Sequence, residues 1–275
     1  MKTIIALTDF SATALNAVNY AADMACIICS NLSLMHVCPI TPAVNEVPVS
    51  ALLLEKQVAD AEEQMRLLKE NIIYRTRDRI HVTTIVTQGI VVPEIEVYSA
   101  SVKPYAVVMG TESANALERF LIEGKTISVM QQLSWPLIVV PPDVKFESLR
   151  KIGLACDLKN VIETIPLKEI KSVVEAFHAE LLVLHVSTES GDSFSTEPVK
   201  ESAWLQEILG DLNPKYHFII DTDIDNAINE FADKNDPDLL MIIPKNHNLL
   251  SKIFKHSHSK RLVLHTHVPV MAIHE

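Results

Sequence analysis

The sequence contains no apolar run approaching the ~18 residues that a membrane-spanning helix needs. Its start is apolar only over the five residues 3–7, before Thr8 and Asp9, so it lacks the long core of a secretory signal peptide. Basic residues are outnumbered, since 24 lysines and arginines face 35 aspartates and glutamates, for a net charge of −11. This balance disfavours nucleic acid and anionic membranes as partners. We therefore expect a cytoplasmic protein that binds neither.

Cysteine is also scarce. The four cysteines are too few for a disulfide framework in a chain of 275 residues, which favours a reducing compartment. Cys26 and Cys29 have the C-x-x-C spacing of redox motifs, but they fall late in an expected helix, away from the helix N-terminus that stabilises a thiolate. We expect them to pack in the core, with redox work as the alternative.

Apolar stretches rich in β-branched residues alternate along the chain with longer segments of helical spacing. In the first half, the expected strands cover residues 2–7, 32–37, 80–86, 105–109 and 137–140. The expected helices cover residues 11–29, with Ser11 as N-cap, 52–73, 92–102 and a run ending at 133. Alternation of this kind predicts the α/β class, with a parallel sheet and right-handed crossovers.

The same pattern begins again after a short linker at residues 144–149. The matched positions, in the same order in both halves, are Asp9 with Asp157, His36 with His185, and Pro136 with Pro269. Three ordered matches predict an internal duplication, with domains at residues 1–142 and 150–275. His36 and His185 both follow apolar strand residues, so we expect them to share a structural role near a strand end.

Residues 105–140 hold the first candidate site. A buried strand ends at Gly110, a polar loop follows, and Gly124-Lys125-Thr126 opens a helical run. α/β sheets hold phosphate at such places, because the helix N-terminus offers free N–H groups at the carboxyl edge of the sheet. Gly124-Lys125-Thr126 also mimics the end of a Walker A loop, but Arg119 stands where the leading glycine should be, so we reject that interpretation.

Four segments together resemble the universal stress protein family. They are Thr8-Asp9-Phe10-Ser11, His36-Val37, Met109-Gly110-Thr111 and the closing strand from Trp135-Pro136 to Pro141. Both halves carry the pattern, so the chain resembles a tandem member. The resemblance implies two Rossmann-like domains, each a five-stranded parallel sheet of order 3-2-1-4-5 with helices on both faces. It also implies an intramolecular pseudo-dimer through the fifth strands, whose pairing would cover two apolar edges, and makes a homodimer an expectation.

Nucleotide-binding members of that family carry Gly-x2-Gly-x9-Gly-Ser/Thr after the fourth strand. Here Gly110 matches the first glycine, while Ser113 and Glu123 replace the second and third. A one-residue shift of the loop would present Gly124, Lys125 and Thr126 to a phosphate instead. The resemblance further places Asp9 beside the ribose and Val37 and Met109 near the base. The candidate cofactor is ATP, and its candidate binding residues are Asp9, Val37, Met109, Gly110, Ser113, Gly124, Lys125 and Thr126.

Simpler roles compete with this site. Asp9 could cap the first helix, and Gly110 could serve a tight turn only. In the second half, the equivalent loop has no glycine between residues 244 and 259, and Pro244 is taken to replace the first glycine, which removes an N–H donor. His265 and His267 form a potential metal pair, although hydrogen-bonding roles at a strand end are the simpler interpretation.

These patterns favour a stress-response protein that is not an enzyme. We predict a cytoplasmic binding or regulatory module with a degenerate nucleotide site in domain 1, no bound metal and an adenine nucleotide as its small-molecule partner. The alternative is an ATP-binding switch or slow ATPase that uses the loop after the fourth strand of domain 1. A third hypothesis is a metal or redox responder that uses the terminal histidines or Cys26 and Cys29.

Overall fold

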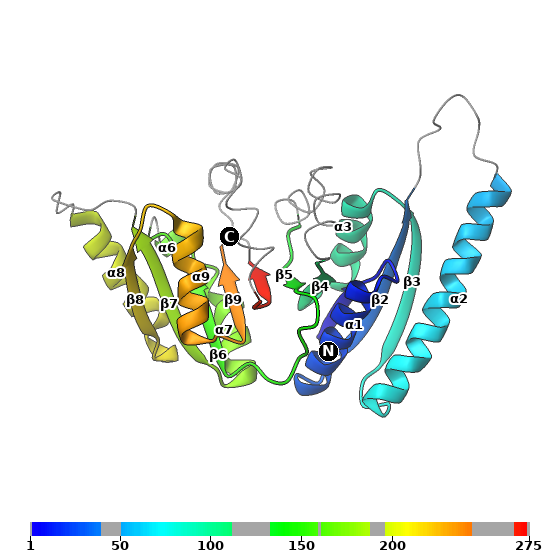
Figure 1. The fold of residues 1–275 in the computed structure, drawn as a ribbon, viewed down its shortest axis with the longest axis horizontal. Coiled ribbons are helices and arrows are strands. Elements are labelled where there is room, and N and C mark those ends of the chain that lie inside the picture. The colour runs from blue at the N-terminus through cyan, green and yellow to red at the C-terminus, as the bar shows by residue number, and fades with distance from the viewer. Residues whose placement is uncertain are drawn as a thin grey trace, which may run out of the picture. The chain divides into compact units, whose positions relative to one another are not determined.

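The computed structural model describes residues 2–39, 51–111, 133–158, 161–187, 196–243 and 267–273. The chain forms two compact units, Met1–Phe146 and Glu147–Glu275, whose elements are labelled in Figure 1. Both units are α/β with parallel strands, as the sequence predicts. Among the described residues, no helix combines the length and apolar character that crossing a membrane requires.

The first unit alternates strands and helices along the chain. Its elements are β1 (Thr3–Leu7), α1 (Ala12–Ile27), β2 (Asn31–Pro39), α2 (Ala51–Thr76), β3 (Val82–Gly89), α3 (Val91–Val102), β4 (Ala106–Gly110) and β5 (Leu137–Val140). The strands lie in the order β3-β2-β1-β4-β5 and every neighbouring pair is parallel. The predicted order 3-2-1-4-5 is therefore confirmed in this unit.

Helices cover both faces of this sheet. α1 and α2 contact each other, and α2 packs on β2 and β3. Successive residues of a strand face opposite sides, and Ser33 of β2 shares a 2.7 Å hydrogen bond with the Tyr98 hydroxyl of α3. Cys38 lies five residues further along β2, so its side chain faces the side opposite to that of Ser33. β1 and β4 lie between these layers, which buries Ile4, Ile5, Ala6 and Ala106 to Val108.

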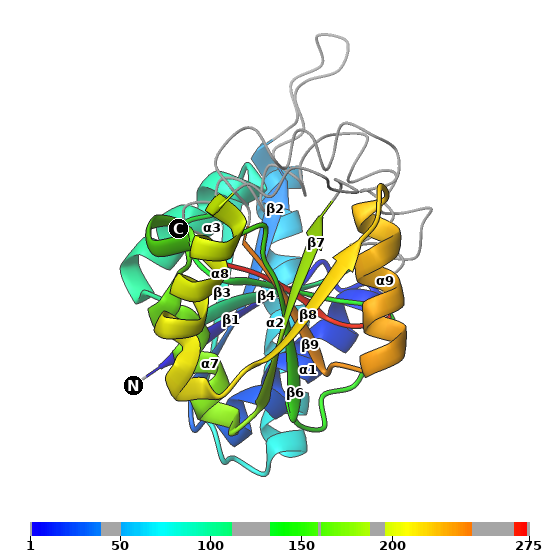
Figure 2. The ribbon, with the colours of Figure 1, turned by 90° about the vertical axis from the view of Figure 1, so that its left-hand side faces the viewer.

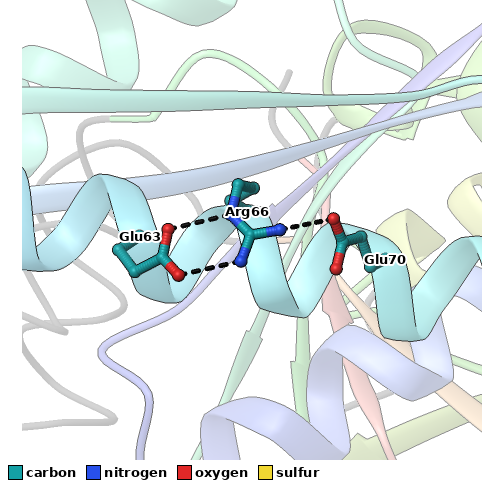
Figure 3. A network of polar contacts seen from close by, with 3 residues as sticks. All are labelled: Glu63, Arg66 and Glu70. Carbon is teal, nitrogen blue, oxygen red and sulfur yellow. Dashed lines mark hydrogen bonds and ion pairs between the residues drawn. The ribbon is translucent and has the colours of Figure 1, made fainter.

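The outer face of α2 is polar. Arg66 donates to Glu63 and Glu70, one turn away on either side, and Figure 3 shows the three side chains along the helix surface. All three are largely exposed. Oppositely charged pairs at these spacings on an exposed helix surface support the helix weakly and are screened by salt. Their contribution is local support for a long helix and not a functional site.

The second unit repeats the arrangement. Its elements are β6 (Lys151–Ala155), α6 (Val161–Thr164), α7 (Leu167–Phe177), β7 (Glu180–Ser187), α8 (Thr196–Leu209), η2 (Gly210–Leu212), β8 (Lys215–Ile220), α9 (Ile224–Asn235), β9 (Leu239–Ile242) and β10 (Val270–Ala272). The strands lie in the order β8-β7-β6-β9-β10, again all parallel. This is the same order as in the first unit, so each unit holds one copy of the predicted sheet.

One face of the second sheet packs against α9 through an apolar cluster. Its buried members are Leu182, Leu184, Ile228, Phe231, Ala232, Leu240 and Val268. Phe231 is the largest of the fully buried side chains. Gly153 of β6 makes room for this packing, because a Cβ there would lie 3.2 Å from the Phe231 ring and 3.0 Å from Leu240.

The helix that follows the first strand differs between the units. In the first unit α1 is continuous, and the Ser11 side chain accepts a 3.2 Å hydrogen bond from the Ala14 amide, which confirms the predicted N-cap. In the second unit the corresponding stretch is divided into α6 and α7 around Pro166, which has no amide hydrogen for the helical ladder. The two units therefore present different helix starts at the carboxyl edges of their sheets.

Candidate functional site

The carboxyl edge of the first sheet brings together the predicted site residues that the structure describes. β1 lies between β2 and β4, with Leu7 opposite Met35 and Ala6 opposite Val108. Asp9, Val37, Met109 and Gly110 all stand at the ends of these three neighbouring strands. Asp9 is exposed, while Val37 and Met109 are half-buried. Ser113, Gly124, Lys125 and Thr126 lie outside the described residues.

The turn after β1 is fixed by its own side chains. The Thr8 amide donates to the Met35 carbonyl at 3.0 Å, and the Thr8 hydroxyl accepts from the Phe10 amide at 2.9 Å. The Asp9 carboxylate accepts from the Ser11 amide at 3.0 Å. Phe10 adopts a left-handed backbone with φ 65°. Asp9 thus stabilises the turn that leads into α1, while Ser11 is the residue that caps the helix, and the ribose role of Asp9 remains a prediction.

We define the unit-1 edge as residues 8–13, 36–39 and 109–111. α1 has no acidic residue in its first turn, so the Asp9 carboxylate just before the helix is the nearest negative charge in that segment. The unit-1 edge contains no lysine or arginine. Hydroxyl oxygens, an exposed carboxylate and half-buried apolar groups suit a neutral sugar and base. The positive charge needed to neutralise a triphosphate would have to come from residues outside the unit-1 edge.

Gly110 is a glycine because β4 ends against the first turn of α1. A Cβ at this position would lie 2.5 Å from the Thr13 carbonyl oxygen and 2.8 Å from its carbon. Both atoms belong to backbone that is held in a capped helix, so they cannot move aside cheaply. Gly110 is therefore explained by a close approach of β4 to α1 and not by a tight turn alone. This tertiary contact brings the end of β4 next to the N-terminus of α1.

The matched histidines occupy the same place in both units. His36 Nδ1 lies 2.7 Å from the Thr8 carbonyl oxygen, and His185 Nδ1 lies 3.0 Å from the Cys156 carbonyl oxygen. Because a carbonyl only accepts, each Nδ1 carries the proton. The predicted shared structural role is confirmed: each imidazole ties its strand to the turn that follows the neighbouring strand. In the first unit the ring also packs on Phe10, with ring centroids 4.7 Å apart.

Replacing His36 with alanine should lower the free energy of unfolding of the first unit by about 1–2 kcal/mol, because a half-buried carbonyl loses its donor. His81 provides the control, since its side chain is exposed and its alanine variant should fall within about 0.5 kcal/mol of the parent. Urea denaturation of both variants measures this. Equal stability of the two variants would show that the Thr8 carbonyl does not need the imidazole.

The second unit has the same turn but a different helix start. The Cys156 amide donates to the Leu184 carbonyl at 2.9 Å, and Leu158 has the left-handed backbone of Phe10, with φ 49°. The Val161 amide at the start of α6 is occupied, however, because it donates to the Glu201 carboxylate at 2.7 Å. A carboxylate of the protein itself therefore binds the first amide of α6, whereas in the first unit the Asp9 carboxylate binds the amide of the N-cap residue Ser11, ahead of α1.

Strand register corrects one sequence assignment. Ile152 pairs with Leu239 as Ile4 pairs with Ala106, so the residue equivalent to Gly110 is Ile243 and not Pro244. An isoleucine cannot pass a helix backbone at the distance that Gly110 does. The divided helix after β6 fits this change. The second unit thus carries a large side chain where the unit-1 edge carries a glycine.

Among the residues that the structure describes, the other candidate groups form no site. Cys26 is half-buried, and burial raises the pKa of its thiol, contrary to what a reactive thiolate needs. Cys29 is exposed with φ 52°, so the expectation of core packing is wrong for it. His267 lies 3.7 Å from Asp233 at the surface, and His265 is outside the described residues. In the described ranges, no three His, Cys, Asp or Glu residues gather to hold a metal ion.

Comparison with known proteins agrees with this architecture. The family model described as "Universal stress protein family" matches residues 1–141 and again 149–274. The fold is similar to that of a universal stress protein from Archaeoglobus fulgidus DSM 4304, with a TM-score of 0.76 and 18% identity over 99% of this chain and 96% of that one. It is also similar to a functionally unknown protein from Pseudomonas aeruginosa PAO1, with a TM-score of 0.61 and 13% identity over 100% and 92% of the two chains. No curated protein sequence matches the chain significantly.

Proposed function

Because the chain belongs to the universal stress protein family, we propose that it acts in the cytoplasm as a non-enzymatic, stress-responsive binding and regulatory module. Its ligand is an adenine nucleotide, held weakly at the unit-1 edge. Asp9 contacts the ribose, and Val37 and Met109 contact the base. The second unit serves as a structural and regulatory partner without a nucleotide of its own.

The contrast between the two edges carries this proposal. In the first unit, Gly110 lets β4 approach the capped start of α1, and no acidic side chain occupies the first turn of that helix. In the second unit, Ile243 takes the glycine position and Glu201 holds the helix amide. Hydrogen-bond donors that already serve a carboxylate are not available to a phosphate. A ligand that uses a helix start is therefore favoured in the first unit alone.

Weak binding follows from the composition of the unit-1 edge. The edge offers hydroxyls, a carboxylate and apolar groups but no basic side chain, so phosphate groups gain little there. We expect a dissociation constant of about 100 µM or more, since an interaction of about −5 kcal/mol is what a few hydrogen bonds and base contacts provide. The same lack of charge stabilisation argues against phosphoryl transfer, which depends on cations around the γ-phosphate.

Isothermal titration calorimetry with ATP and Mg²⁺ tests this proposal. We expect one site per chain, and Asp9→Ala should weaken binding about tenfold through loss of a charge-assisted hydrogen bond. The matched control is Asp157→Ala, at the equivalent position of the second unit, which should leave the affinity unchanged. Two sites per chain, or equal loss in both variants, would contradict the assignment.

A phosphate-release assay on the same protein separates the proposal from its alternative. A binding module releases no phosphate above the rate in buffer. Micromolar affinity together with steady turnover would favour the ATP-dependent switch or slow ATPase, built from Gly110, Ser113, Gly124, Lys125 and Thr126.

A further inference from the structure

β8 is an edge strand with an unusual surface. Within the described residues it pairs with β7 alone, and Figure 2 shows it between α8 and α9 with no described element crossing it. Phe218 is 58% exposed and Ile220 is 70% exposed, while Tyr216 is half-buried. These alternate residues share one face of the strand. Large apolar side chains on an open edge favour pairing with another strand.

The first unit provides an internal comparison for this edge. His185 pairs with Phe218 as His36 pairs with Val86, so Gln88 of β3 is the equivalent of Ile220 and Thr84 that of Tyr216. Two of the three positions are thus polar in one copy of the fold and apolar in the other. The apolar edge is therefore a property of this unit and not a requirement of the fold.

The backbone N–H and C=O groups of β8 that do not face β7 belong to the same three residues, Tyr216, Phe218 and Ile220. The Asp221 amide donates to the Ser187 carbonyl at 3.0 Å, which directs the N–H of Asp221 toward β7. In a parallel strand the N–H and C=O of one residue point to the same side, and the side alternates along the strand. Tyr216, Phe218 and Ile220 therefore direct their backbone donors and acceptors away from β7, to the open edge.

We propose that β8 pairs with β8 of a second copy of this chain, antiparallel and centred on Phe218. In this register Phe218 lies opposite its own equivalent, and Tyr216 lies opposite Ile220. Each of these pairs exchanges N–H···O bonds in both directions, because every member has its backbone groups on the open edge. The apolar side chains then meet on one face, where cross-strand aromatic and β-branched pairs are favourable.

Charge supports the same register. With Phe218 at the centre, Lys215 lies opposite Asp221, so opposite charges meet at both ends of the paired segment. Lys215 already forms an ion pair with Glu180 inside the chain, so each lysine would stand between two carboxylates. A centre on His217 would instead oppose Ile220 with Pro214, which has no N–H to donate. A segment that is self-complementary in backbone, apolar contacts and charge fits a second copy better than a foreign strand.

Site-directed crosslinking tests the interface and its register. Hydrogen-bonded antiparallel partners have Cα atoms about 5.5 Å apart, within the range of about 4.4–6.8 Å that a disulfide spans. Phe218→Cys is made in a Cys29→Ser background, because Cys29 is exposed. Diamide, a two-electron thiol oxidant, should convert most of the chain to a covalent dimer as two thiols lose their protons and electrons to it. Gln88→Cys, in the same background, should remain monomeric on a non-reducing gel.

Sedimentation equilibrium provides a second measurement that needs no oxidant. Ile220→Lys should raise the dimer dissociation constant about a hundredfold, since it places an unpaired charge opposite Tyr216 of the second copy, where an apolar contact is lost. Gln88→Lys should leave it unchanged. A wild-type chain that stays monomeric at about 100 µM, or a dimer that Ile220→Lys does not weaken, would overturn the proposal. So would equal crosslinking of both cysteine variants. None of these outcomes bears on nucleotide binding.

Discussion

Replacing Gly110 with valine should lower the free energy of unfolding of the first unit by about 3 kcal/mol. The cause is direct overlap, since even a Cβ would stand 2.5 Å from the Thr13 carbonyl oxygen. Neither β4 nor α1 can shift easily to relieve this overlap, because β4 is paired on both sides and the first turn of α1 is capped by Ser11. The variant must separate β4 from α1 or distort the end of the strand.

The chain has two tryptophans, Trp135 in the first unit and Trp204 in the second, so fluorescence can follow each unit. Urea titration of Gly110→Val in a Trp204→Phe background should show an earlier transition. Gly210→Ala, followed through Trp204 in a Trp135→Phe background because it lies in the second unit, is the control: no neighbouring described atom lies within 4 Å of a Cβ at that position, and its stability should stay within about 0.5 kcal/mol of its own parent. Unchanged stability of Gly110→Val would refute the close approach.

Loss of nucleotide binding in Gly110→Val would follow from damage to the fold, whether or not the glycine contacts phosphate. Asp9 is the better probe, because its side chain is exposed and its removal costs only a helix-entry hydrogen bond of roughly 1 kcal/mol. The binding experiment above therefore rests on Asp9.

Replacing Phe231 with alanine should cost the second unit about 3–5 kcal/mol. The ring is 1% exposed and belongs to the cluster between α9 and the sheet. It also meets the His217 ring edge-on, with centroids 5.2 Å apart. Truncation removes these contacts and leaves a cavity beside Gly153, where the strand has no side chain of its own to fill it.

Tryptophan fluorescence again measures the effect. The Trp204 transition should move to lower urea, while the Trp135 transition stays in place. Ile162→Ala serves as the control, because that side chain is 62% exposed and should contribute little. If both tryptophan transitions moved together, the two units would not unfold separately. The proposal that the first unit binds nucleotide independently of the second would then need revision.

The fold was predictable because its signals are local. Apolar strands and helical spacing specify the order of elements, and the closing strand of the first unit has the predicted bounds, Leu137–Val140. Ser11 signals a helix start through its own hydroxyl. The strand order came from the family resemblance, and the pairing in both units agrees with it.

The sequence-based predictions were wrong where a tertiary contact or the end of a helix determines the position of a residue. Cys29 continues the apolar spacing of α1, yet the helix ends at Ile27 and Cys29 turns left-handed at the surface. Pro244 was the obvious replacement for a glycine in sequence, but pairing with β6 places Ile243 there. No local pattern marks Thr13 as the partner of Gly110 or Glu201 as the partner of the Val161 amide.

The site was predictable in part for a similar reason. Asp9, Val37, Met109 and Gly110 gather because parallel strands end at one edge, which the strand order alone determines. Their individual roles depend on contacts that a sequence does not contain. The capping of the Ser11 amide by Asp9 and the fit of Gly110 against α1 needed the structure. The phosphate-side residues of the predicted site remain predictions.

The central claim is that nucleotide binding belongs to the first unit and not to the second. Titration of ATP and Mg²⁺ into protein labelled with ¹³C at the methionine methyls tests it most directly, because Met109 lies at the unit-1 edge while Met241 and Met271 lie in β9 and β10. We predict that the Met109 signal shifts saturably at millimolar ATP and that the signals of Met241 and Met271 do not move. Shifts of Met241 or Met271 with a stationary Met109, or no shift at all, would contradict the claim.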